Sequence, residues 1–298
     1  MIKIDGVTKK FGSVTAVNNL SLTVESGSVF GLVGSNGSGK STLLRMISGV
    51  IFPQSGAIYI DDEKVFENFS AKAKCFFVSD FPFFYSDSTL ESLSKLYRGV
   101  YPNWSDGVYL NLCSMFPIKR KAKIISMSKG MQRQAALILA LSTQPQYLML
   151  DEVFDGLDPV GRQLLKKLLM QAVSERNMTV IIASHNLREL EDICDHVGFL
   201  HKGGIVLEEE LDSLKLGIHK IQAAFAKPLP DNAFDKLNII KKDKVGSICR
   251  FVAKGNYDEI MNEISLLSPI FAEALPLTLE EVFISEMEAA GYDIDNIL

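Results

Sequence analysis

A glycine-rich loop between an apolar stretch and a helical pattern constrains this chain more than any other feature. Residues 34–41 read Gly-Ser-Asn-Gly-Ser-Gly-Lys-Ser, directly after the nearly continuous apolar stretch 29–33 and before a helical pattern over 41–48. Glycines let successive backbone N–H groups point inward as an anion nest, and the helix N-terminus adds positive potential. Lys40 adds a point charge, and the Ser41 hydroxyl can bind Mg²⁺. The segment therefore predicts a phosphate-binding loop in an α/β sheet.

Two adjacent carboxylates follow a second apolar stretch. Residues 147–150 read as a buried strand, and Asp151 and Glu152 come directly after it. Parallel-sheet enzymes place their sites at the carboxyl ends of strands. Asp151 is predicted to hold Mg²⁺, usually through water, and Glu152 to polarise an attacking water. Since neighbouring side chains of an ideal strand point to opposite faces, the two acids are assigned different roles. The alternative is a strand that ends in two solvated acids.

Strand and helix patterns alternate along the first two thirds of the chain, which predicts a mostly parallel sheet covered by helices. The first ~30 residues favour strands, and a segment from about 80 to 125 mixes aromatics with short helical patterns. Over the first two thirds of the chain, the expected strands are 14–24, 29–33, 57–60, 75–78, 147–150 and 180–183. The expected helices are 41–48, 129–141, 161–175 and 187–194. Beyond about residue 211, short strands and a final helix from Thr278 indicate a small α+β unit.

Composition excludes several classes of protein. Lys and Arg number 31 against 36 Asp and Glu, a net charge of −5, so no nucleic acid is expected as a partner. No apolar run approaches the roughly 20 residues of a membrane span, and the N-terminus lacks a secretory signal, so we expect a cytoplasmic chain. The four cysteines and four histidines are scattered, without metal-ligand or disulfide spacing.

Residues 127–132, Met-Ser-Lys-Gly-Met-Gln, resemble the signature of the nucleotide-binding subunits of the ABC transporter family. The resemblance implies that Ser128 and Gly130 open a helix whose N-terminus faces the γ-phosphate of ATP bound to a partner subunit. Lys129 replaces the usual first glycine of the signature, and Met131 stands at the usual glutamine position. Lys129 adds a cation close to where phosphate is expected.

The resemblance implies further roles. His185, directly after the strand pattern that ends at Ser184, corresponds to a histidine that contacts the γ-phosphate and steadies the catalytic Glu152. Asp155 and Asp158 resemble the loop that runs between two ATP sites. Phe11 stands where the family stacks an aromatic ring on adenine, although packing in the core explains a phenylalanine there nearly as well. The full predicted ATP-binding set is Phe11, Gly34, Ser35, Asn36, Gly37, Ser38, Gly39, Lys40, Ser41 and Thr42.

Three positions depart from the family pattern. Asp80 stands where a glutamine usually follows the strand 75–78, and we assign it to the metal site with Ser41 and Asp151. Val153 replaces a proline that usually follows the catalytic glutamate. Arg133-Gln134 reverses the usual Gln-Arg order after the signature. None of these residues is expected to touch the phosphate cradle.

The predicted fold class is α/β: a P-loop NTPase (RecA-like) core with a parallel sheet, an antiparallel β subdomain, a helical subdomain and a small C-terminal α+β extension. We expect an ABC ATP-binding domain over 1–215, with the helical subdomain at about 80–140, and an accessory extension over 216–298. Within the extension, residues 277–284 are similar to the ends of many ATP-binding subunits of bacterial exporters.

The predicted function is that of an ATPase subunit that powers an ABC membrane transporter, with ATP and Mg²⁺ as cofactors and export as the preferred direction. A membrane-spanning permease on another chain would hold it at the inner face of the cell membrane. It would act as a homodimer or as a heterodimer with a paralogous ATPase.

Two other functions are less consistent with the sequence. A soluble ABC-type ATPase acting on ribosomes or DNA would carry two cassettes, or a long coiled coil between Lys40 and Ser128, for which the interval leaves no room. A P-loop kinase or a GTPase would leave the signature and His185 unexplained.

Overall fold

The computed structural model describes residues 1–226, 229–230 and 233–289, and the chain divides into two compact units, Met1–Glu208 and Glu209–Leu298. The boundary expected after residue 215 falls within α8 (Leu211–Leu216), the first helix of the second unit. Among the described residues, no helix combines the length and the apolar character that crossing a bilayer requires.

A six-stranded sheet in the order β10-β9-β3-β8-β7-β6 forms the centre of the first unit. The neighbours β9, β3, β8, β7 and β6 pair in parallel. Every residue of β3, β7 and β8 is buried, as expected for strands covered on both faces. The strands are β3 (Val29–Val33), β6 (Cys75–Val78), β7 (Tyr147–Asp151), β8 (Thr179–Ser184), β9 (His196–His201) and β10 (Gly204–Glu210).

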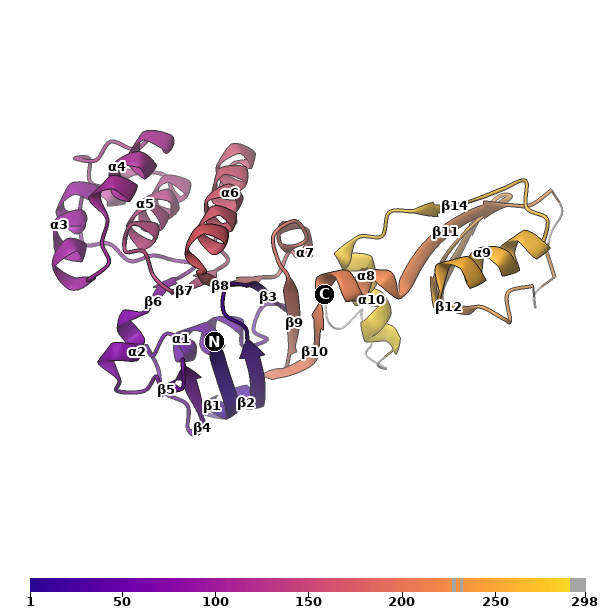
Figure 1. Ribbon diagram of the computed structural model, residues 1–298, viewed down its shortest axis with the longest axis horizontal. Helices are drawn as coiled ribbons and strands as arrows, with labels where there is room; N and C mark the ends of the chain where they lie inside the picture. The colour runs from indigo at the N-terminus through magenta and orange to yellow at the C-terminus, as the bar shows by residue number, and fades with distance from the viewer. Residues whose placement is uncertain (227–228, 231–232, 290–298) are drawn as a thin grey trace. The chain divides into compact units, whose positions relative to one another are not determined.

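A four-stranded sheet in the order β2-β1-β4-β5 lies at the bottom of the first unit in Figure 1. Its strands are β1 (Ile2–Phe11), β2 (Val14–Val24), β4 (Ser55–Ile60) and β5 (Glu63–Lys64), and all of their pairings are antiparallel. Ile2 and Ile4 alternate with exposed residues and share one core cluster with Leu43 and Leu44 of α1 (Lys40–Ile47). The helix after the glycine-rich loop is therefore held between two layers of buried side chains.

Helices α3, α4 and α5 gather on the opposite side of the unit (Figure 1). Hydroxyl caps start each of them: Thr89 accepts from the backbone N–H of Ser92, Ser105 from Val108 and Ser128 from Met131. Besides α1, the helices of the unit are α2 (Phe69–Ala73), α3 (Leu90–Val100), α4 (Asp106–Met115), the 3₁₀ turn η1 (Ile124–Ser126), α5 (Lys129–Ser142), α6 (Pro159–Arg176) and α7 (Leu187–Leu190).

The helix expected over 187–194 is wrong beyond Leu190. The backbone N–H of Asp195 donates to the carbonyl of Val29 at 2.9 Å, and its carboxylate accepts from the Val29 N–H at 2.7 Å. These two bonds fasten Asp195 to the start of β3 and lead the chain into β9. Pairing with the sheet therefore overrides the helical pattern.

The second unit contains an antiparallel sheet in the order β12-β13-β11-β14. Helix α9 packs on one face, where Ile260 and Ile264 share a core with Ile221 and Phe251. The elements are β11 (Ile218–Ala224), β12 (Asn238–Val245), β13 (Ile248–Lys254), α9 (Tyr257–Leu266), β14 (Phe271–Leu275) and α10 (Leu279–Ala289). The capping box expected at Thr278 is confirmed, because Thr278 and Glu281 exchange backbone-to-side-chain hydrogen bonds.

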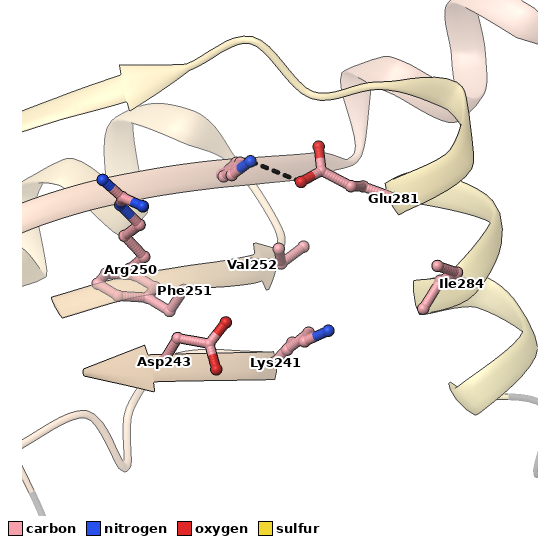
Figure 2. Close-up of a pocket in the computed structure, with 8 residues that line it drawn as sticks. Lys241, Asp243, Arg250, Phe251, Val252, Glu281 and Ile284 are labelled. Atoms are coloured by element: carbon pink, nitrogen blue, oxygen red, sulfur yellow. Dashed lines mark hydrogen bonds and ion pairs between the residues drawn. The ribbon is translucent and has the colours of Figure 1, made fainter. Parts of the chain in front are cut away.

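The other face of this sheet carries charged side chains around a small pocket (Figure 2). Lys220 lies next to Ile221 in β11 and so points to the opposite face of the sheet. Its Nζ donates to Oε1 of Glu281 on α10 at 2.5 Å, and Arg250 Nε donates to Gln222 Oε1 at 2.6 Å. The Lys220–Glu281 ion pair therefore fastens α10 to the sheet, and the bond to Gln222 orients the Arg250 guanidinium without neutralising its charge.

Removing a core side chain from α1 tests how strongly this helix is held. We expect Leu43→Ala, at a fully buried position, to lower the free energy of unfolding by about 2–5 kcal/mol through lost burial and a cavity. Leu110→Ala is the control, because Leu110 is 53% exposed and its truncation should stay within about 0.5 kcal/mol. Denaturant titration of both variants measures the difference, and equal losses would contradict this account of the core.

Candidate active site

The loop 34–41 connects β3 to α1 with two residues in left-handed backbone conformations, Gly37 (φ 82°) and Gly39 (φ 113°). A Cβ on Gly39 would lie 2.2 Å from the carbonyl oxygen of Ala16, and one on Gly34 would lie 2.4 Å from that of Leu200. These two glycines are therefore required by the protein's own backbone, independently of any ligand. Asn36 and Gly37 are exposed at the tip of the loop.

Lys40 begins α1 with its side chain curled back beneath the loop. Its Nζ donates to the carbonyl oxygens of Gly34 at 2.6 Å and Ser35 at 3.3 Å, and it lies 3.4 Å from Oε1 of Glu152. The side chain is only 5% exposed. A buried cation thus lies between the glycine-rich loop and the acidic end of β7.

Ser41 and Asp151 meet as expected. The Ser41 hydroxyl donates to Oδ1 of Asp151 at 3.0 Å, while Oδ2 of Asp151 is buried with no hydrogen-bond partner among the described residues. Burial raises the pKa of Asp151, the hydrogen bond from Ser41 opposes the shift, and the charge of Glu152 adds to it. The hydroxyl of Ser38 in the same loop is also buried, with no hydrogen-bond partner in the part of the chain that the structure describes. Hydroxyl and carboxylate oxygens are ligands that Mg²⁺ prefers, so this pair fits that ion.

Glu152 does not continue the strand. Strand β7 ends at Asp151, and Glu152 has a φ of 47°, so the expectation that the two acids point to opposite faces of an ideal strand is wrong. Its backbone N–H donates to the carbonyl of Ala183 at 2.9 Å. This turn brings the Glu152 carboxylate to Lys40, while Asp151 contacts the neighbouring Ser41.

His185 follows β8, the strand next to β7. Its Nδ1 lies 2.9 Å from Oε2 of Glu152, and its backbone N–H donates to the same oxygen at 3.3 Å. One carboxylate oxygen each of Glu152 and Asp155 and one imidazole nitrogen of His185 all lie within 4.8 Å of one another. The structure therefore brings the two predicted catalytic residues into direct contact.

The signature segment opens α5, as expected. Ser128 caps the helix, since its Oγ accepts from the N–H of Met131 at 3.3 Å. Ser128 and Lys129 are exposed, and Gly130 and Met131 are half-buried. A Cβ on Gly130 would lie 2.5 Å from the carbonyl oxygen of Gly156, so this glycine is also required by a close approach within the chain.

The loop 155–158 lies between β7 and α6 and contacts the signature helix, where Arg133 donates to the Asp155 carbonyl. Asp158 caps α6, because its Oδ1 accepts from the backbone N–H of Gly161 at 2.6 Å. Asp158 is therefore explained by helix capping within one chain, and its predicted place between two ATP sites stays a prediction.

Arg133 is the residue whose importance sequence reasoning missed. One guanidinium nitrogen donates to the carbonyl oxygens of Glu152, at 2.9 Å, and Asp155, while the other donates to the carbonyl, at 3.1 Å, and the carboxylate of Asp80. Partial burial raises the pKa of Asp80, and the charge of Arg133 opposes that shift. The sequence predicts only that these departures do not touch the phosphate cradle, and the structure shows in addition that Arg133 bonds to the backbone of Glu152. A signal was available, because the two unusual residues carry opposite charges.

Asp80 faces Arg133 rather than the Ser41–Asp151 pair. A role in the metal site would require its carboxylate to turn away from the guanidinium, so this assignment stays a prediction.

Phe11 ends β1 with its ring 51% exposed, so the alternative of core packing is wrong. Lys9 Nζ lies 5.4 Å from the ring centroid. The exposed ring leaves an apolar surface to which a planar base could bind.

Comparison with known proteins identifies the family. The ABC transporter family model matches residues 17–155. The ABC transporter ATP-binding protein YtrB of Bacillus subtilis (strain 168) is 32% identical over 287 residues, which cover 96% of this chain and 98% of YtrB. The bacitracin transport ATP-binding protein BcrA of Bacillus licheniformis is 33% identical over 219 residues, or 72% of this chain and 71% of BcrA. The similarity to YtrB thus extends over nearly the whole chain.

Solved structures share the fold. The ATP-binding cassette MJ0796, in a dimeric post-hydrolysis state with ADP and Pi, matches with a TM-score of 0.64 and 25% identity over 71% of this chain and 99% of the cassette. An ATP binding subunit of an ABC transporter matches with a TM-score of 0.66 and 23% identity, covering 72% of this chain and 92% of that subunit. The predicted α/β P-loop fold is confirmed by these similarities.

The site residues lie in the part of the chain that the family comparisons match. The glycine-rich loop, the acidic end of β7 and the signature at the start of α5 all lie in the unit that has these relatives. The protein is therefore an ATP-binding and ATP-hydrolysing member of the ABC transporter ATP-binding protein family.

Proposed function

We propose that this ATPase pairs with a second copy, or with a paralogous ATPase, and drives an export permease carried on another chain at the inner face of the membrane. The observation that carries the proposal is the meeting of Lys40, Glu152 and His185 beside the Ser41–Asp151 pair. The relatives named as transport proteins favour this function over one on ribosomes or DNA.

The glycine-rich loop and Lys40 would bind the phosphates of ATP, with adenine against the exposed ring of Phe11. Ser41 and Asp151 would hold Mg²⁺, and the unpartnered Oδ2 of Asp151 supports this assignment. The ion would neutralise charge on the β- and γ-phosphate oxygens. Lys40 would exchange its bonds to the Gly34 and Ser35 carbonyls for bonds to phosphate oxygens.

Glu152 would act as the general base that accepts a proton from the attacking water. Its contact with Lys40 and His185 supports the role, because both partners hold the carboxylate on the side of the loop. His185, with its side chain 45% exposed, would contact the γ-phosphate and keep Glu152 in place.

The second protomer would complete each site. Ser128 and Lys129 are exposed at the N-terminus of α5, where a helix end can bind an anion. Ser128, Lys129, Gly130 and Met131 of one protomer would then face the γ-phosphate held by the other. Asp155 and Asp158 would lie between the two sites. The dimeric cassette with bound ADP and Pi among the similar structures supports this arrangement.

A permease would dock beside the segment that follows β6. Phe81, Phe83 and Tyr85 are 74%, 80% and 68% exposed, which is unusual for aromatic side chains so close together. A cavity of about 150 Å³ lies beneath this segment, lined in part by Phe84 and by Tyr97 of α3. Exposed rings beside a cavity suit an apolar segment of a membrane partner.

The direction of transport is proposed from the relatives. BcrA is named for bacitracin transport, SrtF of Streptococcus pyogenes for lantibiotic transport and a Bradyrhizobium relative for Nod factor export. We therefore assign this chain to an exporter, with residues 216–298 as its accessory extension.

Glu152→Gln tests the catalytic base. We expect hydrolysis to fall by about 10²–10⁴-fold because a positioned base is lost, while ATP binding persists and a nucleotide-bound dimer accumulates. Phosphate release, equilibrium binding of a fluorescent ATP analogue and gel filtration with ATP measure the three effects. Glu175→Gln, at an exposed position on α6, is the control and should resemble the wild type. If Glu152→Gln hydrolysed ATP at the wild-type rate, Glu152 would not be the general base.

Mixed dimers test the shared site. Lys40→Ala and Ser128→Ala chains should each be inactive alone, because every site then lacks one group. Mixing them should restore up to about a quarter of wild-type activity, since half of randomly paired dimers are mixed and each has one intact site. Phosphate release at rising chain concentration measures the recovery. If mixing restores nothing although each variant still dimerises, sites shared between protomers are ruled out.

Phe83→Ser tests the docking segment. We expect it to abolish co-purification of a membrane protein with the tagged chain, because a central aromatic anchor at an interface is lost. Phe69→Ser on α2 is the control, since Phe69 is equally exposed at 82% but lies outside the segment. Equal recovery of the membrane partner with wild type and both variants would place the docking surface elsewhere.

A further inference from the structure

Arg133 connects three segments that meet at the active site. It lies in the second turn of α5, and its side chain is only 12% exposed. Its guanidinium donates to the carbonyl oxygens of Glu152 and Asp155 on one side and to the carbonyl and carboxylate of Asp80 on the other. Four acceptors on three residues use the planar, forked geometry that only arginine offers.

The contact with Glu152 is important because the backbone of this residue is strained. A φ of 47° is uncommon for residues other than glycine, asparagine or aspartate. Such a backbone conformation persists only where surrounding contacts hold it. The Glu152 N–H is held by the Ala183 carbonyl at 2.9 Å, and its carbonyl oxygen by Arg133 Nη1 at 2.9 Å. Arg133 therefore supplies the shorter of the two hydrogen bonds that the Glu152 carbonyl accepts among the described residues.

The same guanidinium sets the next turn of the chain. The backbone N–H of Asp155 donates to the Glu152 carbonyl at 3.3 Å, and Arg133 donates to both carbonyls of this turn. Without the arginine, the Glu152 carbonyl would keep only this long bond. The turn would then be free to rotate the Glu152 carboxylate away from Lys40 and His185.

Asp80 holds the guanidinium in its orientation. Its carboxylate is 30% exposed and forms an ion pair with the largely buried Arg133. Breaking a buried pair on one side leaves an uncompensated charge, so each residue depends on the other. The family resemblance predicts glutamine at both positions, and here both have changed to opposite charges that touch.

We propose that Arg133 is a positioning residue for ATP hydrolysis, which holds the strained Glu152 backbone in its productive conformation while Asp80 aligns the guanidinium. The proposal rests on the proposed role of Glu152 as general base. Arg133 touches neither the reacting atoms nor Lys40, so its effect falls on the chemical step and not on nucleotide affinity.

Two substitutions separate charge from geometry. R133K keeps a positive charge for Asp80, so the fold is retained, but a lysine cannot bridge Asp80 and both carbonyls together. We expect kcat to fall by about tenfold to a hundredfold, because a small displacement of a catalytic group is that costly, with KM and analogue affinity within about twofold of wild type. The kcat of R133Q should fall at least as far. Thermal melting of the full-length chain checks that both variants are folded.

A matched control comes from another Arg–Asp pair. Arg98 of α3 forms an ion pair with Asp106, and both side chains are more than half exposed. R98K should therefore hydrolyse ATP like the wild type. If R133K and R98K both keep wild-type kcat, the positioning role of Arg133 is excluded, while the proposed function stands.

Combining R133K with E152Q tests whether Arg133 acts on hydrolysis through Glu152. In an E152Q background, R133K should cause no further fall in residual hydrolysis, because its effect passes through Glu152. A further fall of tenfold or more would show that Arg133 acts elsewhere and would overturn the inference. If E152Q alone hydrolyses ATP like the wild type, the proposed function fails first, which distinguishes the two failures.

Discussion

The parallel pairing of β3, β8 and β7 is the constraint on which the site depends. In-register parallel pairing places the carboxyl ends of these strands at one edge, so the glycine-rich loop, His185 and Asp151-Glu152 leave the sheet side by side. Residues separated by more than a hundred positions in sequence thus form contacts of about 3 Å, as between Ser41 and Asp151. Complete burial of the three strands makes this edge rigid, because every backbone group along them must stay paired.

Electrostatics explains why the site is polarised before any ligand binds. Lys40 is almost fully buried and is neutralised by Glu152 and by two loop carbonyls. Asp151 keeps one buried oxygen that no described residue hydrogen-bonds, which leaves capacity for a cation. A buried cation and a buried carboxylate oxygen without a partner in the described part of the chain, brought together at the loop, cost free energy unless ligand binding compensates them. The site therefore favours a ligand that brings both negative phosphates and a metal ion.

Much of the fold could be predicted because its signals are local. The strand 29–33, the loop 34–41 and the following helix each follow from residue types over fewer than ten positions, and the structure has them within about one residue. The helix expected over 187–194 failed because Asp195 is fastened to Val29, which lies far away in sequence. The strand pair β9 and β10 was missed for a similar reason, since its place in the sheet depends on β3 and not on its own pattern.

The sequence alone determined the family, the phosphate-binding loop and the order of the acidic, signature and histidine segments, because these depend on residue identity at short spacing. Only the tertiary structure decided how they are held: the left-handed backbone of Glu152, the approach of Gly130 to the Gly156 carbonyl and the bonds from Arg133 to Asp80, Glu152 and Asp155. Most of these contacts join residues about 20 to 50 positions apart and end on a backbone carbonyl, which every residue has. Residue type therefore carries no record of the backbone contacts, and only the opposite charges of Asp80 and Arg133 leave a trace in the sequence.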